Sequence, residues 1–287
     1  MMTLATLRDE AEMLARQLPD LSLQAEAADL VHPGAAGRKR AGAGEQFWQY
    51  RRYAQTDAAD RIDWRRSARG DEYYVRETEL ETARTILFWT DPNPGFNWRG
   101  GEDRPTKVDR ARILMLALGL LLSKDGERIG VLNGHRAAAL GKTAPDRLAE
   151  DLLAENTGTL SPPKSTALTI VASDFYDPLS EWRTRLSALA AKCRHGVLLC
   201  VSDPIEHEFP YSGRMKFSRP GGLAHRIFGR AESVRDDYFM RLKAQHDGLS
   251  ALATQMGWAL VTHRTDDDPL RAAAALLGAL EQFGRKA

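Results

Sequence analysis

Residues 44–81 read GEQFWQYRRYAQTDAADRIDWRRSARGDEYYVRETELE, and their composition differs from that of the Ala- and Leu-rich remainder of the chain. Aromatic side chains, arginines and carboxylates are interleaved here more densely than a hydrophobic core requires. Arginine beside aromatic rings and carboxylates forms stacks and bidentate ion pairs, which hold side chains in one geometry. We therefore expect an ordered platform of short strands and turns.

Four motifs in this stretch carry a resemblance to a known family. They are Tyr50-Arg51-Arg52-Tyr53 followed by Asp57, then Arg61-Ile62-Asp63-Trp64, Ser67-Ala68-Arg69 and Tyr74-Val75-Arg76-Glu77. Residues 44–80 resemble the signature of the bacterial family called domain of unknown function 58, and residues 81–287 resemble that family more loosely. The resemblance implies a von Willebrand factor type A domain after the signature and a MoxR-type AAA+ ATPase as protein partner.

The signature segment is expected to fix the edge of that domain and to present part of a docking surface. Arginine and aromatic residues are favoured at the energetic centres of protein interfaces. The candidate docking or structural residues are Arg61, Asp63, Trp64, Arg65, Ser67, Arg69, Tyr74, Arg76 and Glu77. The same residue types suit single-stranded nucleic acid. The carboxylates among them favour internal pairing instead, so nucleic-acid binding through residues 38–66 is an alternative.

The bulk composition narrows the class of protein. Lys and Arg number 40 against 39 Asp and Glu, and the resulting charge of +1 argues against a dedicated nucleic-acid binder. The two cysteines, Cys193 and Cys200, form no disulfide framework, which fits a reducing compartment. The longest apolar run, Ile113 to Leu122, is too short for a membrane span. We expect a cytoplasmic protein without a secretory signal or membrane helix.

Apolar strand patterns alternate with helical patterns after residue 81, which predicts a doubly wound, mostly parallel α/β sheet of the von Willebrand type A, Rossmann-like kind. We divide the chain into an N-terminal helix and basic linker (1–43), the signature segment packed on the main domain (44–80), and the main domain (81–287). The predicted strands are 85–89, 128–132, 167–173, 197–201 and 258–263, with 137–140 as a hairpin partner. The predicted helices are 3–18, 107–124, 145–155, 179–193, 225–256 and 268–283, and 33–44 is a predicted loop. A break near Gly229 or Gly248 is an alternative for the helix over 225–256.

Three predicted strands end in an aspartate: Asp91, Asp174 and Asp203. Ligands of open α/β sheets bind beyond the carboxyl ends of the strands, and magnesium prefers clustered oxygen ligands. The resemblance places a metal motif of the form D-x-S-x-S at Asp91, Asn93 and Gly95, where both serines are replaced. It places a second aspartate near the metal at Asp174.

The usual metal-binding threonine of that motif has only Thr143 as a candidate. Two interpretations follow. One is a Mg²⁺-bearing adhesion site held by Asp91, Asn93 and Asp174. The other, which we favour, is a degenerate site with no metal or weakly bound Mg²⁺, whose aspartates cap turns and helix N-termini.

Function divides into three hypotheses. The first is a non-enzymatic adaptor that binds a MoxR-type AAA+ ATPase in a chaperone-like or metal-insertion system. The second is a metal-dependent hydrolase in which Asp91 and Asp174 hold a cation that activates water. The third is nucleic-acid binding through residues 38–66, which predicts steep weakening by salt. The sequence contains no phosphate-binding loop, so we expect the chain itself not to hydrolyse nucleotide.

Overall fold

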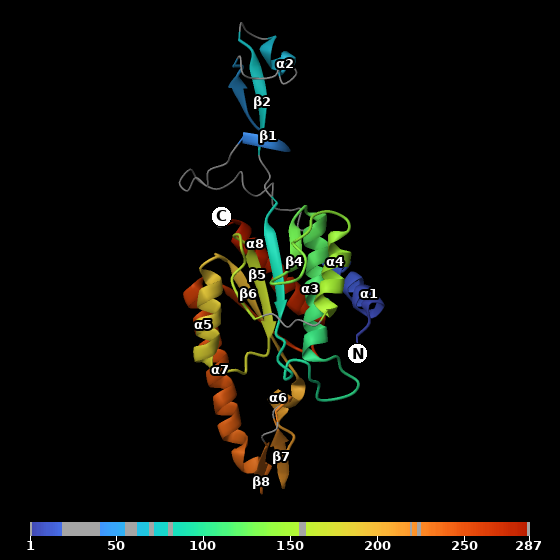
Figure 1. Cartoon of the computed structure of the whole chain (residues 1–287), viewed down its shortest axis with the longest axis vertical. Coiled ribbons are helices and arrows are strands. Elements are labelled where there is room, and N and C mark those ends of the chain that lie inside the picture. The colour runs from blue at the N-terminus through green and yellow to red at the C-terminus, as the bar shows by residue number, and fades with distance from the viewer. Residues whose placement is uncertain are drawn as a thin grey trace. The chain divides into compact units, whose positions relative to one another are not determined.

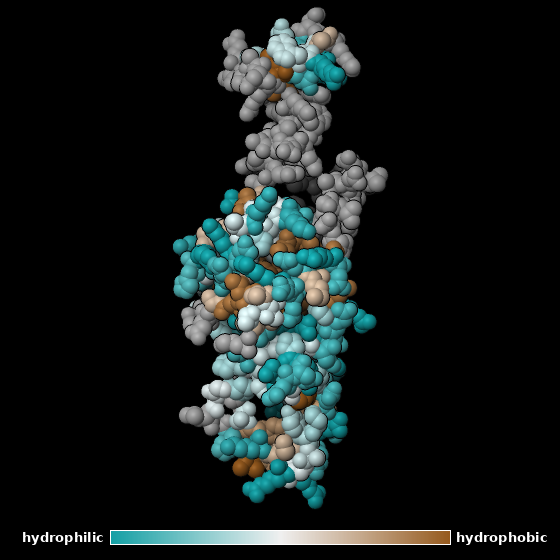
Figure 2. Space-filling model, turned by 90° about the vertical axis from the view of Figure 1, so that its right-hand side faces the viewer, coloured by the Kyte–Doolittle hydropathy of each residue, from teal (hydrophilic) through white to brown (hydrophobic). Residues whose placement is uncertain are grey.

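The computed structural model describes residues 2–18, 41–54, 62–68, 72–79, 83–154, 159–218, 220–222 and 225–285. Contacts within the chain define two compact units, which we describe separately. Figure 1 draws the chain as a ribbon, and Figure 2 draws it as a space-filling surface coloured by hydropathy. The larger unit contains Met1–Ala27 and Arg84–Lys286, and the smaller unit contains Ala28–Ala83. The boundary near residue 83 lies close to the predicted end of the signature segment.

The larger unit is built on a five-stranded sheet in which every neighbouring pair of strands is parallel. Its strands are β3 (Thr85–Thr90), β4 (Arg128–Val131), β5 (Leu168–Ser173), β6 (Gly196–Ser202) and β9 (Ala259–Arg264), in the order β4-β3-β5-β6-β9. All five were predicted to within two residues. The inner strands are buried along almost their whole length, as expected when helices cover both faces of a parallel sheet.

Alternate residues of β3 point into two separate cores, which shows that both faces of the sheet are covered. Ile86 and Phe88 pack with helices α1 (Leu4–Ala15), α3 (Lys107–Lys124), α4 (Ala144–Leu153) and α8 (Pro269–Arg285). Leu87 and Trp89 pack with α5 (Leu179–Ala190) and α7 (Arg235–Met256). Figure 1 shows α3 and α4 on one side of the sheet and α5 on the other. The predicted doubly wound α/β class is confirmed.

The N-terminal helix belongs to the larger unit. Thr3 caps α1 by accepting a hydrogen bond from the Thr6 backbone amide at 3.1 Å, as its sequence position predicts. Leu7 and Leu14 on the inner face of α1 are buried in the same core as α3 and α4. In the described part of the chain, no helix combines the length and apolar character that crossing a membrane requires.

The predicted helix over residues 225–256 is present from Arg235 onward, as α7, and the prediction is wrong for residues 225–234. His225–Phe228 forms β8, which pairs antiparallel with β7 (Met215–Ser218), and a short 3-10 helix (Ala231–Val234) precedes α7. Aromatic contacts hold this hairpin, including Phe217 with Phe228 at 5.8 Å between ring centroids. The predicted hairpin pairing of 137–140 with β4 is present as a single antiparallel bridge between Ile129 and Ala139. The strands β7 and β8 have four residues each and are too short for periodicity to identify them.

The smaller unit consists of an antiparallel pair, β1 (Ala41–Arg52) and β2 (Tyr74–Glu79), with one helical turn, α2 (Trp64–Ser67). The loop predicted over 33–44 is wrong from Ala41 onward, where β1 begins; residues 33–40 lie outside the described residues. The expectation of short strands and turns in the signature segment is confirmed for the described residues. Between the two strands, Ile62 makes one bridge with Val75, and Asp63 caps α2 by accepting a hydrogen bond from the Arg66 amide at 3.0 Å.

Candidate functional site

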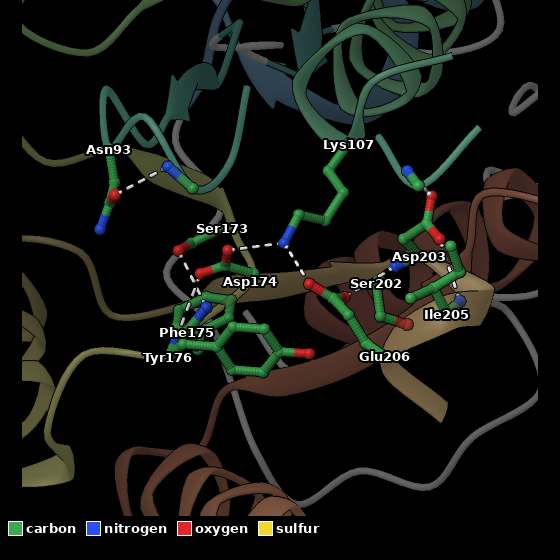
Figure 3. A network of polar contacts seen from close by, with 12 residues as sticks. Asn93, Lys107, Ser173, Asp174, Phe175, Tyr176, Ser202, Asp203, Ile205 and Glu206 are labelled. Atoms are coloured by element: carbon green, nitrogen blue, oxygen red, sulfur yellow. Dashed lines mark hydrogen bonds and ion pairs between the residues drawn. The ribbon is translucent and has the colours of Figure 1, made fainter. Parts of the chain in front are cut away.

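The three predicted aspartates lie at the carboxyl edge of the sheet, where Asp91 follows β3, Asp174 follows β5 and Asp203 follows β6. These strands are neighbours, so their ends meet. All three aspartates are buried. Figure 3 shows the polar network that surrounds two of them, Asp174 and Asp203. The sequence therefore located the site, although it did not identify all of its members.

Asp91 connects the ends of two strands. Its Oδ2 accepts a hydrogen bond from the Ser173 hydroxyl at 2.6 Å, and its Oδ1 accepts one from the Asn93 amide at 2.9 Å. Burial raises the pKa of Asp91, and the hydrogen bonds from Ser173 and Asn93 oppose that rise. The carboxylate is thus a structural tie between the ends of β3 and β5.

The centre of the network is Lys107, which the sequence analysis missed. Its ammonium lies 2.8 Å from Asp174 Oδ2 and 2.7 Å from Glu206 Oε1, and the residue is only 1% exposed. Burial lowers the pKa of Lys107, but the carboxylates of Asp174 and Glu206 raise it by more, so its pKa lies above the ordinary value. Lys107 is therefore a permanent buried positive charge at neutral pH.

Two aromatic rings lie close to this charge. The ring centroid of Tyr176 is 5.1 Å from the Lys107 nitrogen, and that of Trp98 is 5.8 Å from it. Both distances fall within the range of a cation–π contact. Tyr176 remains partly exposed, so its ring separates the ammonium from solvent.

Asp203 and Glu206 extend the network through α6 (Pro204–Glu208). They form a capping box in which Asp203 Oδ1 accepts from the Ile205 amide at 3.0 Å and Glu206 Oε2 accepts from the Asp203 amide at 2.8 Å. Asp203 Oδ2 also accepts from the Gly100 amide at 2.9 Å. The interpretation of this aspartate as a helix cap is confirmed.

Asn93 and Gly95 of the predicted metal motif lie close to Asp174. Asn93 Oδ1 accepts a hydrogen bond from the Gly95 amide at 2.9 Å. A Cβ atom at Gly95 would lie 3.4 Å from Asn93 Oδ1 and 3.6 Å from Asp174 Oδ2, so a serine here would face the site, whereas glycine offers no hydroxyl. No group of three or more His, Cys, Asp or Glu side chains with metal-binding geometry occurs among the residues that the structure describes.

Thr143 does not join the site. It occupies the N-cap position of α4, close to Gly141, whose carbonyl accepts a hydrogen bond from Ser123 near the C-terminal end of α3. Lys107 is the first residue of α3, which has 18 residues and hence a length of about 27 Å. The predicted threonine thus lies near the opposite end of this helix.

Two cavities adjoin the aspartate network. One, of about 550 Å³, is lined by Asp174, Tyr176, His207 and His263 among others. His263 in this lining is buried, and its Nε2 atom has no hydrogen-bond partner. Burial and the nearby charge of Arg110 lower the pKa of His263 to about 4. The other, of about 600 Å³, is lined by residues that include Asp91, Asn93, Asp177 and Arg185.

The signature residues of the smaller unit have two different roles. The Ser67 hydroxyl donates to the Asp63 carbonyl at 2.8 Å and accepts from the Tyr74 amide at 2.9 Å, so these residues tie α2 to β2. Trp64 and Tyr73 instead project outward, 61% and 56% exposed, with ring centroids 5.8 Å apart.

The structure describes fewer details of the other predicted signature residues. Arg65 is exposed on α2. Arg61 and Arg69 lie outside the described residues, as do the side chains of Arg76 and Glu77. Docking by any of these residues stays a prediction.

The sheet and its helices define an α/β protein of the doubly wound, Rossmann-like class. Within that class the chain belongs to the family described as Protein of unknown function DUF58, whose model matches residues 49–248. The match covers more than half of the chain and runs from the end of β1 into α7. Comparison with curated proteins and comparison with solved structures each gave no match.

Proposed function

We propose that the chain is a non-enzymatic protein-binding module that works with a MoxR-type AAA+ ATPase in a chaperone-like or metal-insertion system. The observation that carries this proposal is the exposed aromatic pair, Trp64 and Tyr73, on the signature segment. Aromatic residues are enriched at the centres of protein interfaces, and adjacent exposed apolar side chains form the kind of patch that marks interaction sites. The identity of the partner follows from the family resemblance.

The aromatic pair is held ready for a partner. Asp63 and Ser67 fix the turn that carries Trp64, and Tyr53 lies 6.5 Å from Tyr73 between ring centroids. Because the backbone is already ordered, little conformational entropy would be lost when a partner covers the rings. Arg66 lies 5.7 Å from the Tyr74 ring and Arg52 pairs with Glu72 at 2.9 Å. These contacts order two arginines of the same segment beside Tyr74 and Glu72.

The arrangement at the sheet edge favours a structural role for the aspartates over catalysis. Asp174 is paired with Lys107, and Asp91 accepts a hydrogen bond from Ser173. A general base needs a free lone pair within reach of substrate. In the proposed module these carboxylates stabilise the carboxyl edge of a von Willebrand type A domain, with Asp91, Asn93 and Gly95 on the loop after its first strand.

The test is a binding titration between the fluorescently labelled chain and the purified MoxR-type ATPase of the same cells. Trp64→Ala and Tyr73→Ala should each weaken binding at least about 30-fold, as expected when an aromatic hot spot of about 2 kcal/mol is removed. Met13→Ala on α1 is the matched control, because Met13 is equally exposed but lies in the larger unit.

Two outcomes would contradict this proposal. Unchanged affinity of both aromatic variants, with circular dichroism showing them folded, would remove the pair from the docking surface. If the ATPase does not bind and single-stranded DNA does, with steep weakening by salt, the nucleic-acid hypothesis replaces the adaptor.

A further inference from the structure

We infer that the Lys107 ammonium takes the place of the divalent cation at the carboxyl edge of this sheet, so that the chain carries its own fixed positive charge there and binds no metal. This inference concerns the larger unit alone and does not depend on the proposed partner. It decides between the two interpretations of Asp91, Asn93 and Asp174 that the sequence leaves open.

The first argument is the position of the charge. The ammonium bridges carboxylates from two different elements, Asp174 after β5 and Glu206 in α6, at 2.8 and 2.7 Å. A divalent cation at the ends of neighbouring strands would make the same kind of bridge between oxygen ligands. Figure 3 shows Lys107 reaching between Asp174 and Glu206.

The second argument is the use of the surrounding oxygens. Magnesium requires roughly six oxygen ligands in octahedral geometry. Every carboxylate oxygen of Asp91, Asp174 and Glu206 already accepts a hydrogen bond from the chain. The donors are Ser173 and Asn93 for Asp91, Lys107 and Tyr176 for Asp174, and Lys107 and Asp203 for Glu206. Each of these oxygens keeps a second lone pair. A metal ion that bridged Asp174 Oδ2 and Glu206 Oε1 would nevertheless occupy the position of the ammonium and would have to displace it.

The third argument is the cost of placing a lysine there. Lys107 is the first residue of α3, where the helix dipole disfavours a positive charge. Burial of the side chain adds a second penalty. The two carboxylates offset both penalties, together with the rings of Trp98 and Tyr176, so a buried lysine at this position depends on these partners. Its backbone amide donates to the Trp98 carbonyl at 3.2 Å, which fixes the start of the helix against the loop that follows β3.

The functional consequence is that any docking at this edge is independent of magnesium. Tyr176 and Trp98 lie close to the ammonium, and Lys107 is almost fully buried, so the positive charge is held within the chain. With the ammonium in place of a metal ion, there is no metal whose coordination a carboxylate from a partner could complete, as it does in metal-bearing adhesion domains of the type that the sequence resembles.

The experiment is thermal unfolding of the purified chain in chelator and in about 10 mM Mg²⁺ or Mn²⁺ at matched ionic strength. The midpoint of the wild-type chain should be the same in all conditions. Folded Lys107→Ala should unfold at a lower temperature in chelator. It should also gain on the order of 2–4 °C from Mn²⁺, because two unpaired carboxylates then face a vacated space. Arg112→Ala removes a positive charge from the same helix and should show no gain from metal.

Two results would overturn the inference. One is a saturable rise of the wild-type midpoint with Mg²⁺ that Asp174→Asn abolishes. The other is folded Lys107→Ala without any response to metal, which would make Lys107 an ordinary ion pair. If Lys107→Ala does not fold, Mn²⁺ titration of the wild-type chain by electron paramagnetic resonance is decisive. A signal from free Mn²⁺ alone at every step of the titration supports the inference, and stoichiometric loss of that signal through binding contradicts it.

Discussion

Lys107→Met removes the central charge of the site while retaining most of the volume of the side chain. The variant leaves Asp174 and Glu206 without the ammonium that lies 2.8 and 2.7 Å from them. Both carboxylates are largely buried, so solvent does not replace the lost partner. Removing one member of a buried ion pair costs about 3–5 kcal/mol. At about 2–4 °C per kcal/mol for a domain of this size, we expect the unfolding midpoint to fall by roughly 10 °C.

Urea unfolding followed by tryptophan fluorescence measures this loss. Lys124→Met is the matched control, because Lys124 is an exposed lysine at the other end of α3. The triple variant Lys107→Met, Asp174→Asn, Glu206→Gln should recover most of the lost stability, because it leaves no buried charge without a partner. A loss below about 1 kcal/mol in Lys107→Met, or no recovery in the triple variant, would refute the reasoning.

Three further predictions concern other parts of the chain. The pKa of His263 is about 4 in the folded state, below its ordinary value of 6.5. The stability that the neutral imidazole contributes is therefore complete above pH 6.5 and is lost as pH falls towards 4. Between pH 7 and pH 5, the free energy of unfolding should therefore fall by about 2 kcal/mol less in His263→Gln than in the wild type, as measured by chemical denaturation. Equal falls in the two proteins would contradict this. Ser67→Ala leaves the Tyr74 amide unpaired, which costs about 1–3 kcal/mol and should speed proteolytic cleavage within residues 62–79; an unchanged rate would contradict the role of Ser67. Gly196→Ala would place a Cβ 2.5 Å from the Trp258 ring and should cost about 1–3 kcal/mol in thermal unfolding, whereas a neutral result would show that the ring can move.

The sheet could be predicted from sequence because its strands are apolar along their whole length and are separated by well-marked helices. Lys107–Lys124 is an example: Thr106 caps it, an apolar run fills it, and its predicted bounds are those of the structure. The β7–β8 hairpin could not be predicted, because each strand has four residues and aromatic contacts made across the hairpin and with Phe209 hold it in place.

The candidate site was predicted in position but not in composition. Asp91, Asp174 and Asp203 were found because each follows a strand, which is a local signal. Lys107 was missed because its partners Asp174 and Glu206 lie 67 and 99 residues away in the sequence. One local sign existed: a lysine in the first turn of a helix opposes the helix dipole, which suggests a nearby negative charge. Packing of the signature segment on the larger unit stays a prediction.

The central claim, that the signature segment binds a protein partner through its exposed aromatic pair, is tested most directly by hydrogen–deuterium exchange. The chain is measured alone and with saturating MoxR-type ATPase. The account predicts that the ATPase slows exchange at residues 62–68 and 72–75, which surround Trp64 and Tyr73, and that Trp64→Ala removes this protection. Protection confined to the larger unit, or no protection at saturating ATPase, would contradict it.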